Sequence, residues 1–68
     1  SAGAFGDCKP LCRGVWELRI DHGPGYRLYY AQDGKKLVLL LLGGDKRQQQ
    51  ADIEKAVGCW NEYQKRKP

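Results

Sequence analysis

Alternation of hydrophobic and other residues predicts two neighbouring β-strands in the first half of the chain. Residues 15–21 and residues 26–32 each place large apolar side chains at every second position, the period of a half-buried strand. The apolar positions are Trp16, Leu18, Ile20, Tyr26, Leu28 and Tyr30. The opposite face of the two strands carries Val15, Glu17, Arg19, Asp21, Arg27, Tyr29 and Ala31.

Turn residues separate these strands from each other and from a third. His22-Gly23-Pro24-Gly25 predicts a turn, because glycine supplies positive φ and proline fixes φ. Asp33-Gly34 is a strong hairpin signal. Residues 37–42 then form an uninterrupted apolar run, typical of a strand that is covered on both faces and lies in the centre of a sheet.

A helix is predicted at the end of the chain, from about residue 46 to about residue 64. Gly43-Gly44 interrupts the apolar run, and Asp45 is a favourable N-cap residue because its carboxylate can accept from a free backbone N–H. Apolar residues then recur at helical spacing and form one stripe that should face the sheet. The stripe consists of Ile53, Ala56, Val57, Trp60 and Tyr63.

Together these elements predict an α+β fold, an antiparallel three-stranded sheet followed by one C-terminal helix. We expect a single domain over residues 1–68, with residues 1–13 as a lead-in, a three-strand meander over 15–42 and the helix over 45–64. One helix covers one face of a sheet, whereas the third strand is apolar on both faces. We therefore expect the chain to self-associate through the uncovered, leucine-rich face.

Composition indicates which kind of partner and which cellular compartment to expect. The formal net charge of +4 and the pI near 9.1 favour anionic partners. No apolar run reaches the roughly 18–20 residues of a membrane span, and no signal-peptide pattern is present. An odd number of cysteines, 3, favours free thiols in a reducing cytoplasm. We expect neither a metal nor a cofactor, since a zinc site would need all three cysteines and the single histidine, His22.

Charged side chains gather on one side of the predicted sheet. Glu17, Arg19, Arg27 and Tyr29 share a face of the first hairpin, and Lys46 and Arg47 begin the helix beside it. Cations near a helix N-terminus suit a phosphate group, most simply that of RNA. The competing interpretation is a solvated polar face on which Glu17 pairs with Arg27 across the strands.

Four motifs in this region carry a resemblance to a known family. They are Glu17-Leu18-Arg19, Gly23-Pro24-Gly25-Tyr26-Arg27, Leu41-Leu42-Gly43-Gly44-Asp45-Lys46 and Gln49-x-x-Asp52-Ile53. In order and spacing they resemble the RelE/ParE superfamily of bacterial toxins, and most closely its phage-derived, HigB-like "addiction module killer" branch. The resemblance covers roughly residues 3–64 and lacks the family's N-terminal strand and two helices, so it implies an excerpt or a truncated copy.

The resemblance implies the toxin of a type II toxin–antitoxin system, a ribosome-dependent mRNA endoribonuclease whose partners are a cognate antitoxin, mRNA and the ribosome. It assigns Arg19, Arg27 and Lys46 to the RNA-cutting surface. The residues expected to contact RNA are Glu17, Tyr29 as a stacking platform, Arg47 and Gln49. RelE itself has a lysine where this chain has Glu17 and a tyrosine where it has Asp52, so the general acid and base stay unassigned.

Two other functions remain open from the sequence. ParE-like relatives inhibit DNA gyrase by binding, without cutting RNA. A chain of this length could also be a non-catalytic remnant that binds antitoxin or self-associates.

Overall fold

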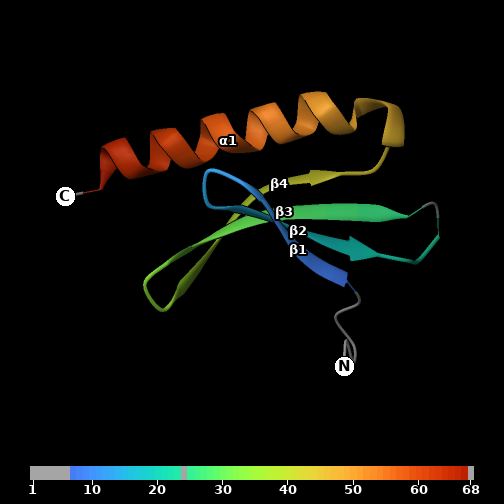
Figure 1. Cartoon of the computed structure of the whole chain (residues 1–68), viewed down its shortest axis with the longest axis horizontal. Coiled ribbons are helices and arrows are strands. Elements are labelled where there is room, and N and C mark those ends of the chain that lie inside the picture. Colours follow the sequence, from blue (N-terminus) through green and yellow to red (C-terminus); the bar gives the residue numbers. More distant parts are fainter. Residues whose placement is uncertain (1–6, 24, 68) are drawn as a thin grey trace.

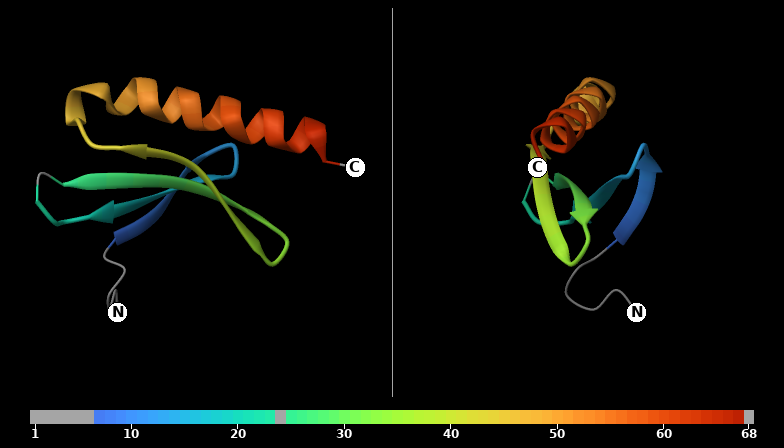
Figure 2. Two further views of the ribbon diagram at one scale, coloured as in Figure 1. Left: turned by 180° about the vertical axis from the view of Figure 1, so that it is seen from behind. Right: turned by 90° about the vertical axis from the view of Figure 1, so that its left-hand side faces the viewer.

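The computed structural model describes residues 7–23 and 25–67, which form a four-stranded antiparallel sheet and a long C-terminal helix. The strands are β1 (Asp7–Cys12), β2 (Val15–Ile20), β3 (Tyr26–Asp33) and β4 (Lys36–Gly43), paired in the order β1-β2-β3-β4. A short 3₁₀ helix, η2 (Lys46–Gln48), leads into α1 (Gln49–Arg66). The helix lies across one face of the sheet and leaves the other face open (Figures 1 and 2).

The first strand corrects the prediction of three strands, which is wrong. Residues 7–12, expected to belong to a lead-in, pair with β2 along their whole length. Pro10 argues against a strand in the sequence because proline has no backbone N–H to donate. It is tolerated here because β1 is at the edge of the sheet and bulges between Pro10 and Cys12. The connection is a two-residue loop in which Arg13 and Gly14 both have positive φ, 53° and 86°. That is the geometry of a type I′ hairpin, here made by a residue pair that is not a common signal for it.

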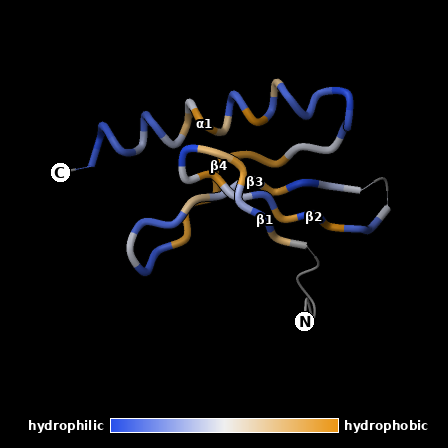
Figure 3. Tube along the Cα trace, viewed as in Figure 1, coloured by the Kyte–Doolittle hydropathy of each residue, from blue (hydrophilic) through white to orange (hydrophobic). Residues whose placement is uncertain are grey.

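The leucine-rich strand also lies elsewhere than expected. β4 is at the edge of the described sheet, not in its centre. A bulge opposite Tyr29 and Tyr30 leaves Leu40 without a paired residue, so that Leu39 and Leu42 project to the same face. Its hydrophobic run (Figure 3) therefore divides between the helix-covered side and an open side.

The helix covers the face of the sheet that carries Glu17 and Arg27. The hydrophobic core consists of Val15, Tyr29, Ala31, Ala56 and Trp60. The expected helical stripe does face this core, since Ala56 and Trp60 are buried and Ile53, Val57 and Tyr63 pack against them. Trp16, one of the apolar positions of the first predicted strand, stacks on Tyr30 on the open face, with ring centroids 6.5 Å apart.

Polar contacts tie both ends of the helical segment to the sheet or to the preceding loop. Asp45 is the N-cap, as expected, and its carboxylate accepts from the backbone N–H of Arg47 at 2.9 Å. At the other end, Asp33 at the end of β3 accepts from the Tyr63 hydroxyl at 2.7 Å and from the Lys67 ammonium at 2.9 Å. The tip of the β3–β4 hairpin thereby holds the last turn of α1.

Replacement of two glycines by alanine should change the stability of the fold in opposite directions. Gly58 lies inside α1, and a Cβ added to it would meet no atom within 4 Å, whereas a Cβ on Gly14 would lie 3.0 Å from Trp60 Nε1 at a φ of +86°. Gly58→Ala should stabilise the fold by about 0.5–1 kcal/mol, and Gly14→Ala should destabilise it by more than about 1 kcal/mol. Urea denaturation measures both, and a shift of the two variants in the same direction would contradict this packing.

The anchor at Asp33 should make stability depend on pH. Hydrogen bonds from Lys67 and Tyr63 lower the pKa of Asp33 below its ordinary value of 3.8. A lowered pKa in the folded state stabilises the fold above the ordinary pKa, and this contribution is lost as pH falls through the folded-state pKa. At about pH 7 the free energy of unfolding should therefore be larger for the parent chain than for Asp33→Asn. The difference between the two proteins should shrink below about pH 4. A difference that does not depend on pH would show that the carboxylate charge is not involved.

Candidate functional site

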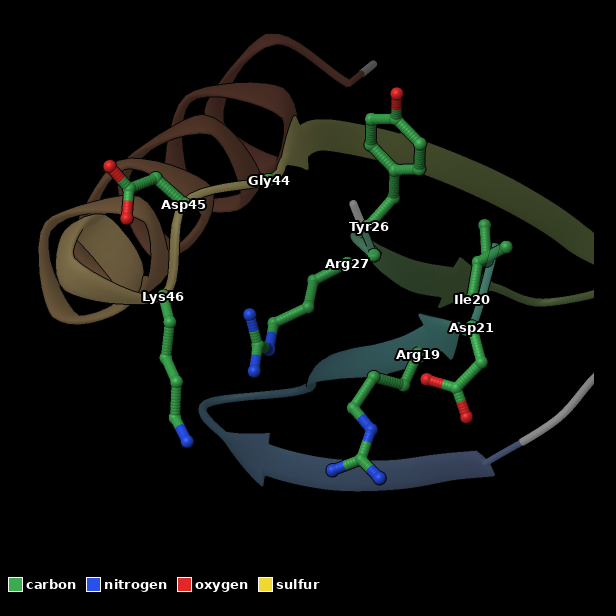
Figure 4. Close-up of a pocket in the computed structure, with 9 residues that line it drawn as sticks. Arg19, Ile20, Asp21, Tyr26, Arg27, Gly44, Asp45 and Lys46 are labelled. Atoms are coloured by element: carbon green, nitrogen blue, oxygen red, sulfur yellow. The ribbon is translucent and has the colours of Figure 1, made fainter. Parts of the chain in front are cut away.

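A cleft of about 470 Å³ opens where the ends of β2, β3 and β4 meet. Arg19 comes from β2, Arg27 from β3 and Lys46 from the segment that follows β4, and all three line it. Their side chains extend to the same side of the sheet (Figure 4). The structure thus brings together the three residues that the resemblance assigns to RNA cleavage, whose role stays a prediction.

Strand register explains why the two arginines are neighbours. Arg19 pairs directly with Arg27, and Arg27 pairs on its other side with Gly43. Like charges placed opposite each other across two strands repel, so the arrangement costs stability unless anions lie nearby. Two carboxylates are among the lining residues, Asp21 and Asp45. The Asp45 carboxylate is turned away from the arginines (Figure 4) and pairs with Arg47 at 3.3 Å, so it does not neutralise them.

A buried carboxylate lies behind the cleft, under the helix. Glu17 is 2 % exposed, and its carboxylate lies 3.1 Å from Arg27 Nε and 3.6 Å from Lys9 Nζ. Gln49, in the first turn of α1, donates from Nε2 to Glu17 Oε2 at 3.2 Å. A carboxylate removed from water needs such partners, because an uncompensated buried charge is strongly destabilising.

This network also orients Arg27. The side chain of Arg27 is 15 % exposed, and its ion pair with Glu17 is made at Nε, an atom that is buried and makes no hydrogen bond among the described residues. The guanidinium group extends from there toward the cleft, on the side of Lys46 (Figure 4). Glu17 therefore acts as a partner that positions Arg27, and its burial leaves it no surface for direct contact with RNA. The pairing of Glu17 with Arg27 that the competing interpretation expected is present, but it is buried and not solvated.

Tyr29 does not lie where a stacking platform must lie. It is 0 % exposed, enclosed in the core beneath α1, so no base can reach its ring in this structure. Burial, and secondarily the charge of Glu17, raises the pKa of Tyr29 above 10.0, so its hydroxyl stays protonated near neutral pH. That hydroxyl is buried without a hydrogen-bond partner among the described residues.

The other two residues expected to contact RNA, Gln49 and Arg47, do not line the cleft. Gln49 is half-buried and holds Glu17, so it ties α1 to β2. Arg47 is exposed beside Asp45 and is not among the residues that line the cleft. Asp52 lies beneath the helix, next to Gly43, where a Cβ would meet its carboxylate oxygen at 2.5 Å. A larger residue at position 43 would therefore have to displace the Asp52 carboxylate.

Lys9 and Tyr26 are the residues that sequence reasoning missed. Lys9 pairs with Glu17 in the sheet register and adds a cation to the same face. Had β1 been predicted as a strand, its alternation would have placed Lys9 on the face of Glu17. Tyr26 lines the cleft together with Gly44, whereas its position in the alternation assigned it to the apolar face alone.

The remaining candidates for chemistry lie outside the cleft. His22 is an exposed turn residue, as expected, and does not line it. Cys8, Cys12 and Cys59 are exposed free thiols. Among residues 7–23 and 25–67, no three histidine, cysteine or carboxylate side chains cluster as a metal site. No helix in that part of the chain has the length and hydrophobicity needed to cross a membrane.

The fold is thus that of an α+β protein, a small antiparallel sheet with one C-terminal helix, and three cations line its cleft. The chain belongs to the family described as "Phage derived protein Gp49-like (DUF891)", which matches residues 4–57. It is 52 % identical over 54 residues to a Haemophilus influenzae protein described as uncharacterized, a match that covers 79 % of this chain and 54 % of the relative. The chain thus spans about half the length of that relative. No solved structure matches it.

The buried pair can be tested by its response to apolar replacement. Glu17→Met leaves Arg27 without its anion and should destabilise the fold by about 3–5 kcal/mol. Glu17→Met/Arg27→Met removes both charges and should recover part of this loss, because two apolar side chains need no partners. Chemical denaturation of the parent, both single variants and the double variant gives the coupling energy. Strictly additive losses would show that the two side chains do not interact.

Proposed function

We propose that this chain carries the RNA-binding cleft of a toxin from a type II toxin–antitoxin system, and that the complete toxin is a ribosome-dependent mRNA endoribonuclease. The observation that supports this proposal is the convergence of Arg19, Arg27 and Lys46 on one cleft. Family membership agrees with a phage-derived protein of this general kind. The resemblance of the motifs to the HigB-like branch supplies the specific activity.

The cleft suits a phosphate that gains negative charge. When the 2′-hydroxyl of RNA attacks its own phosphate, the pentacoordinate transition state carries more charge than the substrate, and positioned cations stabilise it. Arg27 is the best-positioned of the three, since Glu17 contacts its Nε and directs the rest of the group toward the cleft. The reaction also needs a base for the 2′-hydroxyl and an acid for the leaving 5′-oxygen. No residue of the cleft is assigned to either role.

The same cleft explains how an antitoxin would act. An acidic segment laid across Arg19, Arg27 and Lys46 would gain affinity from charge complementarity and would exclude RNA. Inhibition would then require no change in the fold.

RNA binding by the 68-residue chain is the direct test. For single-stranded RNA, the logarithm of the binding constant falls with the logarithm of salt concentration by roughly 0.7 per phosphate contact. Three cations predict a slope of about −2, and Arg27→Ala, Arg19→Ala or Lys46→Ala should each reduce its magnitude by about 0.7. Fluorescence anisotropy with a labelled, unstructured RNA measures this. Arg66→Ala removes the same charge from the far end of α1 and is the matched control, expected to leave the slope unchanged.

Equal effects of Arg66→Ala and Arg27→Ala would mean that binding follows net charge, and would overturn the assignment to the cleft. Circular dichroism of each variant separates a lost contact from a lost fold.

Activity requires a longer version, extended with the N-terminal segment that the RelE/ParE resemblance implies. Its expression should stop growth and cut mRNA on ribosomes, and Arg27→Ala should reduce cleavage by about 10²–10³-fold, as loss of one transition-state donor does. Cys12→Ser should remain fully active. DNA damage signalling without mRNA cleavage would instead establish gyrase inhibition, and a folded, fully toxic Arg27→Ala protein would reject the site.

A further inference from the structure

We propose that the open face of the sheet is an interface at which two copies of this chain pack against each other. The face consists of the strand residues whose side chains alternate away from α1. Its most exposed large side chains are Trp16, Ile20, Tyr26, Leu37, Leu39 and Leu42. Leu37, Leu39 and Leu42 are 59 %, 67 % and 61 % exposed, values far from those of core residues.

The composition of this face identifies the chemistry of its partner. In the described strands, none of the residues that alternate onto the face is charged, although charged residues make up 29 % of the chain. Nucleic acid would find no cation here, and a charged protein surface would find no complement. The face therefore fits an apolar, uncharged partner.

A second copy meets that requirement. The chain has a net charge of +4, and two copies that met through their charged faces would repel each other. Through the open face they meet without bringing like charges together. The arrangement would be two-fold, with each copy presenting the same patch. Stacked sheets of this kind are a common architecture, with an apolar layer about 10 Å thick between them.

The shape and the area of the face support the same conclusion. An apolar hollow of about 240 Å³ lies between Leu18, Leu28 and Leu39 on this face, with Tyr30 in its wall. Leu42 projects from the same face and is not part of the hollow, so one copy offers both a cavity and a side chain to fill it. The exposed apolar area is on the order of 600 Å², at the top of the range of the largest patch on a typical monomer. Two such patches approach the roughly 1,200–2,000 Å² of a standard interface.

This dimer is independent of the proposed function. Ile20 and Tyr26 lie at the edge that the cleft and the open face share, but Arg19 and Arg27 lie on the opposite side of the sheet, so neither cation takes part in the contact. Cleft variants should dimerise normally, and interface variants should keep the salt slope of RNA binding. Failure of one proposal therefore leaves the other standing.

Sedimentation equilibrium of the 68-residue chain between about 5 and 200 μM tests the proposal, since this range reaches the weak, micromolar end of the affinities of interfaces of this size. The parent should form a dimer, strengthened by sulfate, which favours apolar burial. Leu39→Glu should raise the dissociation constant at least tenfold, because it places a charge at the most exposed large apolar side chain of the patch. Asn61→Glu adds the same charge on an exposed position of α1 and should leave dimerisation unchanged.

The native cysteines provide a second measurement that needs no variant. Cys8 lines the hollow on the open face, whereas Cys59 lies exposed on α1. Maleimide labelling of Cys8 should slow as protein concentration rises, while labelling of Cys59 stays constant. A parent chain that remains monomeric at 200 μM, or Cys8 labelling that does not depend on concentration, would overturn the proposal.

Discussion

The contact between Glu17 and its neighbours is the constraint on which the rest of the structure depends. A carboxylate that is 2 % exposed must be compensated, and here β1, β3 and α1 each contribute a partner through Lys9, Arg27 and Gln49. The requirement therefore fixes which face of the sheet the helix covers and how it begins. It also holds one of the cations of the cleft, Arg27. A surface ion pair with the same atoms would have little influence on any of these features.

The two faces of the sheet consequently differ in coverage and in chemistry. One is sealed by α1 over a small core and continues into the cationic cleft. The other is apolar, uncharged and bare, which is the reverse of the usual relation between hydrophobicity and burial. Separation of this kind would allow the chain to engage the proposed anionic ligand and the proposed apolar partner at the same time, because the arginines of the cleft and the leucines of the open face are different residues on opposite faces.

Sequence alone predicts the local features well and the choice between faces poorly. Alternation correctly placed Arg19 and Arg27 on one face, and Asp45 correctly marked the start of the helical segment. The first strand was missed because Pro10 and the Arg13–Gly14 turn carry no ordinary strand or hairpin signal. Alternation also separates two faces without saying which is covered. The apolar face is the natural choice for burial, and only the contacts of Glu17 with other elements reveal that the charged one was selected.

The helix is fastened to the sheet at two places, at Gln49 through Glu17 and at Tyr63 through Asp33. These points are 14 residues apart in the sequence, about 21 Å along a helix. Attached at both, α1 can neither roll about its axis nor slide along the strands without breaking a polar contact. Because the segment leading into α1 bounds the cleft, the fastening of the helix also opposes changes in the width of the cleft. For the anionic ligand proposed above, selection would then operate through size and shape, since the helix resists closure around the ligand.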